Sequence, residues 1–404
     1  MRRRHDELTP PGPRLLGAVL FLCLFASQAA VIALTPVLAE IAADFEISTA
    51  AAGQLRTVSG LTAAAAALSA TLLARRVPLR SLLVAGVAAV GAGSLVSALA
   101  PGFAVLAAGQ ATVGAGIALV TTTATAGAAE WAAPADRARV LSWALLGPPS
   151  AWVVGMPVIG VLGEASWRYG WLALPVLAAA LALAAAAAVA PRRAPGPPVP
   201  RSSLREALRS PGAAPWVAGE LFANSAWTGT LVYSGALFSE TYGTSPTAVG
   251  LLLSAAAVAY VAGNMAMRGR IGDEPMGRLV RLALGLAVTT VAFGAIRPAV
   301  AVSAAIFSAS AFLAGGRTLL GNAAGLDAAP EHRLALMAAR SATLPIGYLV
   351  GAATAGAALA LGGYAAYGVA LGALFAAAAL PLALTSASRR AAPTAAAPAP
   401  TSVT

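Results

Sequence analysis

The 404-residue sequence contains no lysine, and all 26 of its basic residues are arginine. It has one cysteine, Cys23, and two histidines, His5 and His332. A single cysteine excludes an intrachain disulfide, and so few cysteines and histidines exclude a Cys/His metal cluster. A phosphate-binding loop that ends in Gly-Lys-Ser/Thr is also excluded, because the chain has no lysine to complete one. We therefore expect no metal and no cofactor.

Charge of either sign is scarce, since only 10% of the residues are charged and 59% are hydrophobic. Soluble domains carry about 25% charged residues. The mean hydropathy is +0.79. A soluble helical protein rich in alanine is the alternative, but a globular enzyme of this length needs more polar surface than the sequence offers. We also find no clustered nucleophile and base, so the composition argues against an enzyme.

The hydrophobic residues form long runs that are separated by short polar stretches. A bilayer core about 30 Å thick needs about 20 apolar residues per helix. The pattern predicts an all-α polytopic membrane protein with twelve transmembrane helices. The runs cover residues 14–38, 50–73, 80–99, 102–127, 140–163, 169–190, 213–236, 246–267, 277–296, 299–322, 336–360 and 363–385.

The first run has an alternative interpretation as a secretory signal, because three arginines precede "LLGAVLFLCLFASQA". The apolar stretch continues through "AVIALTPVLA", however, and eleven more runs follow it. We interpret it as a retained first helix.

The arginines are distributed unevenly across the predicted loops. With the N-terminus in the cytoplasm, 21 fall on the cytoplasmic side and two, Arg168 and Arg297, on the outer side. Three more, Arg56, Arg317 and Arg340, lie inside apolar runs. This is the positive-inside pattern. It predicts a multi-pass protein of the plasma (inner) membrane with both termini cytoplasmic, and it explains the net charge of +11 without nucleic acid.

The sequence repeats itself at an offset of 196 residues, which aligns "APADRARVLSW" (133–143) with "APEHRLALMAA" (329–339). Six helices per half place both halves in one orientation, as in transporters built from two pseudo-symmetric six-helix bundles. The predicted regions are a cytoplasmic tail (1–13), a first bundle (14–190), a cytoplasmic linker (191–212), a second bundle (213–385) and a disordered cytoplasmic tail (386–404). The matched positions include Pro149 with Pro345, Gly155 with Gly351 and Gly160 with Gly356.

Over residues 14–385 the sequence resembles the major facilitator superfamily. The loop "ATLLARRVPLRSLL" resembles the family's Gly-x-x-x-Asp-Arg-x-Gly-Arg-Arg signature, with a counterpart in "GNMAMRGRIGDEPMGR". "GPPSAWVVGMPVIG" is similar to the signature of the bacterial drug:proton antiporter (efflux) branch, and "SWRYGW" and "FEISTAAAGQ" are also typical. The sequence departs from the pattern at Ala70 and Ala74, where the family has Gly and Asp, and in "LAAGQATVGAG", which lacks the buried Arg of many proton-coupled members.

Two groups of residues are candidates for gating. Gly155, Pro157 and Gly160 are helix breakers in the fifth run, and they predict a bendable seam against the other half. The alternative is a static packing face. Arginines near the cytoplasmic ends of helices could pair with acidic residues and lock that side, or they could serve topology alone. This second group consists of Arg75, Arg76, Arg80, Glu130, Asp136 and Arg340.

Charges inside the apolar runs point to the mechanism. Glu220 is the candidate proton-coupling residue, because a carboxylate there can take up and release a proton as access alternates. Arg317 and Arg340 are possible partners for it, and either could instead bind an anionic substrate group. The alternative is a Glu that snorkels or is paired for structural reasons. Candidates for lining a substrate cavity are Gln28, Trp152, Asn224, Trp227, Tyr233, Arg317 and Tyr348, each of which could equally be ordinary packing.

The sequence thus predicts a secondary active transporter that exports a small hydrophobic or drug-like compound in exchange for protons, as in multidrug resistance. The alternatives are uptake or export of a polar metabolite such as a sugar or amino acid, and a membrane sensor or scaffold that does not transport. The expected partners are a small-molecule substrate, protons and the lipid bilayer, with no nucleic acid. We expect a monomer.

Overall fold

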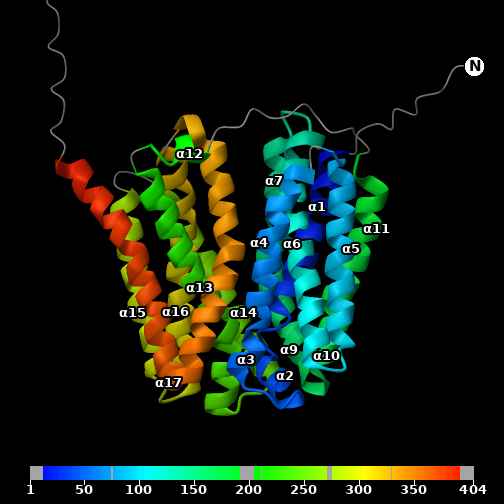
Figure 1. Ribbon diagram of the computed structural model, residues 1–404, viewed down its shortest axis with the longest axis vertical. Coiled ribbons are helices and arrows are strands. Elements are labelled where there is room, and N and C mark those ends of the chain that lie inside the picture. The colour runs from blue at the N-terminus through cyan, green and yellow to red at the C-terminus, as the bar shows by residue number, and fades with distance from the viewer. Residues whose placement is uncertain are drawn as a thin grey trace, which may run out of the picture.

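The computed structural model describes residues 12–73, 76–191, 204–210, 212–270, 275–328 and 330–391. These ranges hold helices and connecting turns, with no strand among them. The long helices lie side by side and run roughly parallel to one another in two groups (Figure 1). We call the end at which α1 begins and α17 ends the upper end, as it is drawn in Figure 1, and the opposite end the lower end.

The first half of the chain supplies six spans, of which the fifth and sixth are built from several consecutive pieces. Two short helices, α2 (Leu38–Asp44) and α3 (Thr49–Gly53), lie at the lower end (Figure 1). The spans are α1 (Pro13–Ile32), α4 (Leu55–Leu73), α5 (Leu79–Ala98), α6 (Phe103–Trp131), the run α7 (Arg137–Ala144), α8 (Gly147–Ser150), η1 (Ala151–Gly155) and α9 (Met156–Ala165), and the run α10 (Trp167–Trp171), η2 (Leu172–Val176) and α11 (Leu177–Val189).

The second half follows a short helix, α12 (Leu204–Ala207). Its last element is two helices that meet at Gly362 and Gly363, where the backbone leaves the helical region and Gly363 has a φ of 64°. A residue without a Cβ adopts that left-handed conformation at little cost. The elements are α13 (Ala213–Tyr242), α14 (Pro246–Ala266), η3 (Arg268–Arg270), α15 (Pro275–Ala295), α16 (Val300–Ala328), η4 (Pro330–His332) and α17 (Arg333–Ala391).

The described residues contain nine helices that are long and apolar enough to cross a membrane. One of the nine contains the break at Gly362 and Gly363 and is therefore two helices. The long helices α4 and α13 carry more polar residues and complete the set. The predicted all-α fold with twelve spans agrees with this arrangement.

Three predicted runs are interrupted where prolines occur, and in the sixth run the π-helical turn η2 contains Pro175. The run 14–38 ends its first helix at Ile32 and resumes at Leu38, with Pro36 between them. Proline has no backbone N–H to continue the helical ladder. The fifth run contains the π-helical turn η1 between Pro149 and Pro157. Such turns accommodate an interrupted ladder without ending the helix.

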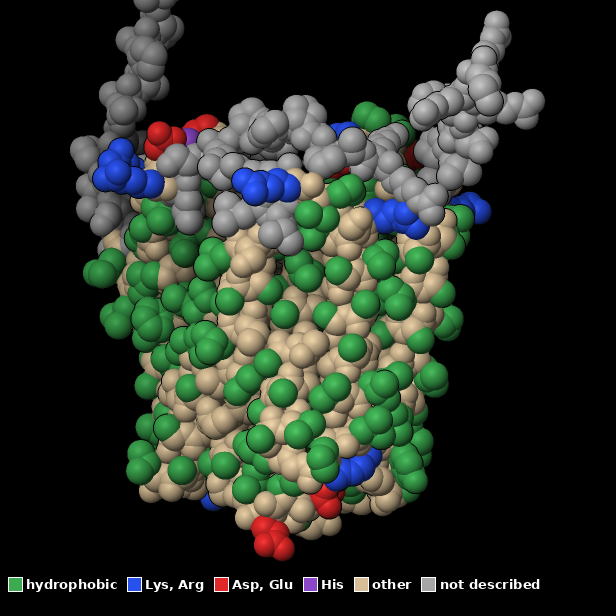
Figure 2. Space-filling view, turned by 45° about the vertical axis from the view of Figure 1, so that its right-hand side comes forward, with side chains coloured by type: hydrophobic (Ala, Val, Ile, Leu, Met, Phe, Trp, Pro, Cys, Tyr) green, Lys and Arg blue, Asp and Glu red, His purple; other side chains and the backbone are tan. Residues whose placement is uncertain are grey.

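The side of the molecule is apolar, and its charges collect at the two ends (Figure 2). Large hydrophobic side chains along the spans, such as Leu68, Leu181 and Leu384, are exposed. In water this surface would be an unusually large apolar patch. Against lipid it is the expected boundary, so the surface fits a multi-pass membrane protein.

The two halves contact each other through a few elements. The described contacts join η1 and α9 to α14, α3 and α4 to α17, and α2 to α13. The hydrogen bonds that we find between described residues of the two halves involve Thr49, Ala50, Gln54 and Val153 of the first half. Their partners in the second half are Tyr233, Glu240, Ser254 and Ala352. These residues lie from the middle of the spans toward the lower end.

Candidate functional site

A buried carboxylate lies between two guanidinium groups in the second half. Glu220 on α13 is 1% exposed. Arg317 on α16 donates from Nη2 to its Oε1 at 2.8 Å, and Arg340 on α17 donates from Nε to its Oε2 at 2.8 Å. Three helices that are distant in sequence are therefore joined at one point. The predicted pairing partners of Glu220 are the residues that contact it.

The charges of this cluster do not cancel. Two arginines face one carboxylate, so the cluster has an excess positive charge. Arg317 also donates to the carbonyl of Gly219 at 3.1 Å, and its Nε is buried without an acceptor. Removing one partner of a buried ion pair costs about 3–5 kcal/mol, because an uncompensated charge remains. The cluster therefore links α13, α16 and α17 strongly.

Gly321 makes the cluster possible, and the sequence analysis missed it. A Cβ at this position of α16 would lie 2.6 Å from Oε1 of Glu220. The carbonyl of Gly321 also accepts a hydrogen bond from Nε1 of Trp216 at 3.0 Å. The available signal was the spacing, because Gly321 follows Arg317 by four residues and so lies on the same helix face.

Asn224 and Trp227 lie beside the cluster, because they follow Glu220 by four and seven residues and so share its face of α13. Asn224 donates to Oγ1 of Thr343 at 2.6 Å, and Trp227 stacks on Tyr260 with ring centroids 6.2 Å apart. Together with Arg317 they line a cavity of about 10 Å³, which is about the volume that one water needs. Ligand pockets are usually about 300–1,000 Å³. The predicted cavity residues thus meet, but in a space too small for a substrate in this conformation.

Arg56 on α4 is a second buried arginine, and its surroundings differ. It is 2% exposed, and it forms no ion pair with a described carboxylate. Its Nη2 is buried without an acceptor. The guanidinium lies over the ring of Tyr348 on α17, 5.8 Å from the centroid, and the Tyr348 hydroxyl lies near the side chain of Gln28 on α1. The structure therefore brings together two predicted cavity residues, Gln28 and Tyr348, and places the second of them against an arginine.

The contact with Tyr348 offsets only part of the cost of burying Arg56. A cation over an aromatic ring contributes about 0.5–2 kcal/mol. An Arg at a helix centre costs about 2.5–3.5 kcal/mol on insertion scales. Gly60, one turn further along α4, lets α17 approach closely, since a Cβ there would lie 2.6 Å from the backbone nitrogen of Leu349. Arg56 is therefore enclosed between the halves with an unsatisfied donor.

Tyr233, which the sequence suggests as a cavity residue, instead joins the two halves. Its hydroxyl donates to the carbonyl of Ala50 at 3.1 Å. Gln54 donates to the Tyr233 hydroxyl at 3.2 Å and to the carbonyl of Ala352 at 3.3 Å. A Cβ at Gly53 would overlap the Tyr233 ring. Gln54 was missed as a site residue, although it ends the quoted stretch "FEISTAAAGQ".

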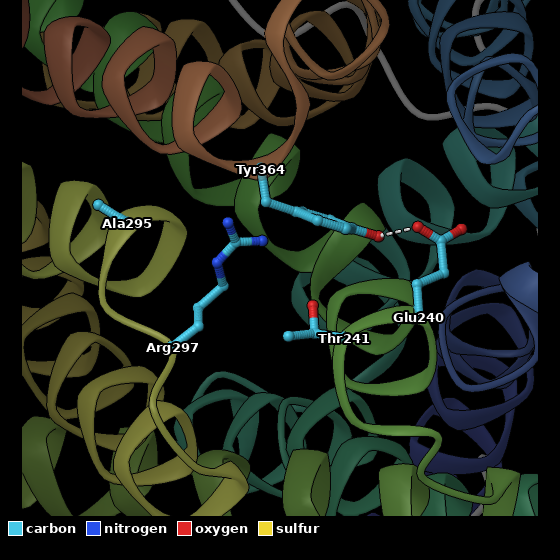
Figure 3. A pocket seen from close by; sticks show the side chains of 5 residues that line it. All are labelled: Glu240, Thr241, Ala295, Arg297 and Tyr364. Atoms are coloured by element: carbon cyan, nitrogen blue, oxygen red, sulfur yellow. Dashed lines mark hydrogen bonds between the residues drawn. The ribbon is translucent and has the colours of Figure 1, made fainter.

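Glu240 forms a further link at the lower end that the sequence analysis did not predict. It accepts hydrogen bonds from Thr49 of the first half and from the Tyr364 hydroxyl, the latter at 2.8 Å. Figure 3 shows Tyr364 pointing toward Glu240, with Arg297 alongside its ring. These residues, with Thr241, line an open pocket of about 530 Å³. Acidic and aromatic groups thus connect α3, α13 and α17.

The predicted seam of the fifth span is only partly at the interface between the halves. A Cβ at Gly160 would overlap the carbonyl oxygen of Pro246 on α14. Pro157 lies near Gly250 of α14, whose own Cβ would lie 3.2 Å from the Pro157 Cα. Gly155 instead faces Ile32 and Leu174 in its own half, and its position in the seam is a correction to the prediction. The helical period turns it away from the face that carries Gly160.

The predicted arginine network at the upper end is described in part. Arg75 lies outside the described residues, so its pairing with Glu130 stays a prediction. Arg76 is exposed. Arg80 donates to the carbonyl of Ala187 on α11, and Asp136 pairs with Arg139 at 3.9 Å. Arg80 and Asp136 therefore do not pair with each other. The neighbouring helix α11 supplies the partner of Arg80, and the next turn of the chain supplies the partner of Asp136.

Two other predicted residues also have defined positions. Arg340 binds Glu220 and so belongs to the buried cluster instead of a surface gate. Trp152 is half-buried in η1 and packs against the apolar core.

Comparisons with known proteins identify the fold. A family profile described as Major Facilitator Superfamily matches residues 20–239, which is more than half of the chain. No curated protein shows significant sequence similarity to the chain.

Three similar solved structures are transporters. A bacterial homologue of the human lysosomal transporter Spinster, inward-facing and unoccupied, is 17% identical, with a TM-score of 0.70 over 93% of this chain and 96% of that chain. A POT family transporter in complex with a thioalcohol-conjugated peptide is 13% identical, with a TM-score of 0.72 over 93% and 96%. The human organic anion transporter MFSD10 (TETRAN) is 15% identical, with a TM-score of 0.66 over 92% and 100%. At these identities the likeness shows the fold alone.

Proposed function

The chain belongs to the major facilitator superfamily, and we propose that it exports a small hydrophobic or drug-like compound in exchange for protons. Membership makes it a secondary transporter and not an enzyme. The cargo, the direction and the coupling ion are the parts that we propose. The drug:proton antiporter branch remains the sequence-based suggestion for them.

The observation that carries proton coupling is the buried carboxylate of Glu220. A carboxylate inside a membrane bundle is costly and is retained mostly where it has a function or a partner. Both Glu220 oxygens accept hydrogen bonds from arginine, so proton uptake requires that one ion pair opens first. Arg340 is the more exposed partner at 18%, against 4% for Arg317. We propose that movement of α17 withdraws Arg340 and leaves Oε2 free to bind a proton.

Alternating access is supported by the distribution of contacts between the halves. The bonds of Tyr233, Gln54 and Glu240 close the lower end. In our proposal the regions 14–190 and 213–385 rock against each other, and these bonds break when the lower end opens. The close contact of Gly160 with Pro246, at the start of α14, is one of the surfaces across which they move.

For orientation we propose that the upper end faces the cytoplasm, with both termini there, in the plasma (inner) membrane. The excess of arginines in the sequence segments that connect the spans on the predicted cytoplasmic side supports it. We expect a cytoplasm-only reporter fused to the C-terminus to be active. If this reporter is silent and a reporter that is active only in the periplasm gives signal at the same position, the C-terminus is not cytoplasmic and the proposed orientation is wrong.

Transport of a polar metabolite is the second candidate. The unpaired Arg56 favours it, because a purely apolar cargo has no use for a buried cation. A sensor or scaffold that does not transport is disfavoured, since the glycine contacts between the halves are close on both α9 and α14.

The test uses everted vesicles with an imposed pH gradient, acid inside, and three fluorescent probes: ethidium (cationic), Nile red (neutral) and fluorescein (anionic). We expect gradient-dependent accumulation of at least one probe by the wild type, and none by Glu220→Gln at equal membrane abundance. Glu331→Gln, which changes an exposed carboxylate, is the matched control and should behave as the wild type. Accumulation by Glu220→Gln at the wild-type rate would remove Glu220 from the mechanism.

A further inference from the structure

We propose that Arg56 binds an anionic group of the transported compound, a carboxylate, sulfonate or phosphate, between the two halves of the protein. The cargo would then be an organic anion with an apolar body. This inference deepens the proposed function and rests on it for the transport step, but not for binding.

The first argument is the absence of a counter-charge. Arg317 and Arg340 share Glu220, and Arg168 at the lower end pairs with Asp44 at 3.1 Å. Among the described residues Arg56 has no carboxylate at ion-pair distance, and its Nη2 is buried without an acceptor. A buried polar group without a partner requires an explanation, and a ligand that is absent from the structure provides one.

The second argument is position. Arg56 is on α4 of the first half, and its ring contact Tyr348 is on α17 of the second half. Gln54, two residues earlier, is part of the contact that closes the lower end. A group held at Arg56 would therefore lie at the junction that separates when access alternates. An arginine inside one bundle would not become accessible in this way.

The third argument is the chemistry of the neighbours. Tyr348, over which Arg56 lies, supplies a hydroxyl, and Gln28 beside Tyr348 supplies an amide. Both are neutral hydrogen-bond donors for an oxyanion. Both side chains are half-buried, so part of their surface is accessible although Arg56 itself is enclosed. A guanidinium presents two parallel N–H groups to a carboxylate or phosphate, which is a geometry that no other side chain offers. The aromatic ring of Tyr348 provides an apolar wall.

The test measures binding to the purified full-length protein in detergent by its thermal stability. The probe is 2-naphthoate, and its neutral amide, 2-naphthamide, is the matched control compound. We expect 2-naphthoate to stabilise the wild type at a concentration about tenfold or more below that needed for 2-naphthamide, since a hydrogen bond to a charged group is the stronger one. Naphthalene-2-sulfonate and 2-naphthyl phosphate distinguish the oxyanion classes.

The variants assign the effect to Arg56. Arg56→Gln should bind 2-naphthoate and 2-naphthamide alike, and Arg168→Gln, which changes an arginine at the lower end, should keep the wild-type preference. Arg56→Lys keeps the charge if Arg56→Gln does not fold, and it should weaken naphthoate binding because the two parallel N–H groups are lost.

Three results would overturn the inference. The first is that none of the three anions stabilises the wild type, and the second is that the wild type binds naphthoate and naphthamide equally. The third is that Arg56→Gln or Arg56→Lys keeps the wild-type preference for naphthoate. The inference and the proposed function can fail separately. Selective anion binding without proton-driven flux in vesicles would refute proton-coupled export and keep the site. Proton-driven flux of Nile red or ethidium with no anion selectivity would refute the anion site and keep proton-coupled export.

Discussion

This protein contains two arginine environments within its spans, and they differ in whether the guanidinium has a carboxylate partner. Arg317 and Arg340 share the carboxylate of Glu220 inside the second half. Arg56 lies between the halves with an aromatic ring as its contact and no described carboxylate. The first arrangement binds three helices of one half together, whereas the second leaves a cation unsatisfied at the junction of two halves. The comparison indicates two roles for buried charge: the ion pairs of Glu220 hold one bundle together, and the unpaired Arg56 is free to bind an anionic ligand.

The largest effect is expected from removal of the shared carboxylate. Glu220→Leu leaves the buried Arg317 and the partly buried Arg340 without a counter-charge, and it should lower the free energy of unfolding by about 3–5 kcal/mol. Denaturant titration of the purified protein measures this change. The triple variant Glu220→Leu, Arg317→Met, Arg340→Met should regain most of the loss, since replacing a whole buried ionic cluster by apolar residues is often nearly neutral. No recovery would mean that the cluster has another structural role.

A change of opposite sign in the free energy of unfolding is expected when the unpaired Arg56 is replaced. Arg56→Met removes a buried cation whose cost the Tyr348 ring only partly offsets, so stability should rise by about 2 kcal/mol. The same denaturant titration measures it. Naphthoate selectivity should disappear in this variant at the same time. A loss of stability as large as that of Glu220→Leu would show that Arg56 is held by a partner, and the contrast between the two environments would then be wrong.

A smaller effect is expected where the halves touch without charge. Gly160→Ala places a methyl group against the carbonyl of Pro246. Overpacking costs about 1–3 kcal/mol, and the helix preference of Ala over Gly returns up to about 1 kcal/mol. We expect a net loss of about 1 kcal/mol and slower gradient-driven flux. Gly285→Ala on α15 is the control, because its Cβ would meet only Leu313 at 3.2 Å. Equal flux in the two variants would argue against a role of the Gly160 contact in the movement of the halves.

The smallest effect is expected from the loss of one side chain's hydrogen bonds between the halves at the lower end. Tyr233→Phe removes the donor to Ala50 and the acceptor of Gln54, which should lower stability by about 0.5–1.5 kcal/mol. The lower end should also open more often. Labelling of a cysteine introduced at position 50 by a membrane-impermeant maleimide, in a background where Cys23 is Ser, measures this opening. Tyr169→Phe, which changes an exposed tyrosine, should leave the labelling rate unchanged.

The sequence by itself determined the helices, their number and the class of fold. Runs of about 20 apolar residues must form helices in a bilayer, because every backbone polar group has to be satisfied within the segment. Prolines at positions 36, 149, 157 and 175 lie at the interruptions of the first, fifth and sixth runs. The pairing of Glu220 with Arg317 and Arg340 was also foreseeable, since few charges were available inside the runs.

Only the tertiary structure decided which side chains face the other half. Tyr233 and Gly155 show this, because the first bonds to Ala50 across the interface and the second packs within its own half. In a helix that is apolar all round, hydrophobic periodicity does not mark the inner face. The isolation of Arg56 has the same origin. A sequence shows that an arginine is present in an apolar run, but whether a carboxylate lies within reach depends on how twelve helices pack.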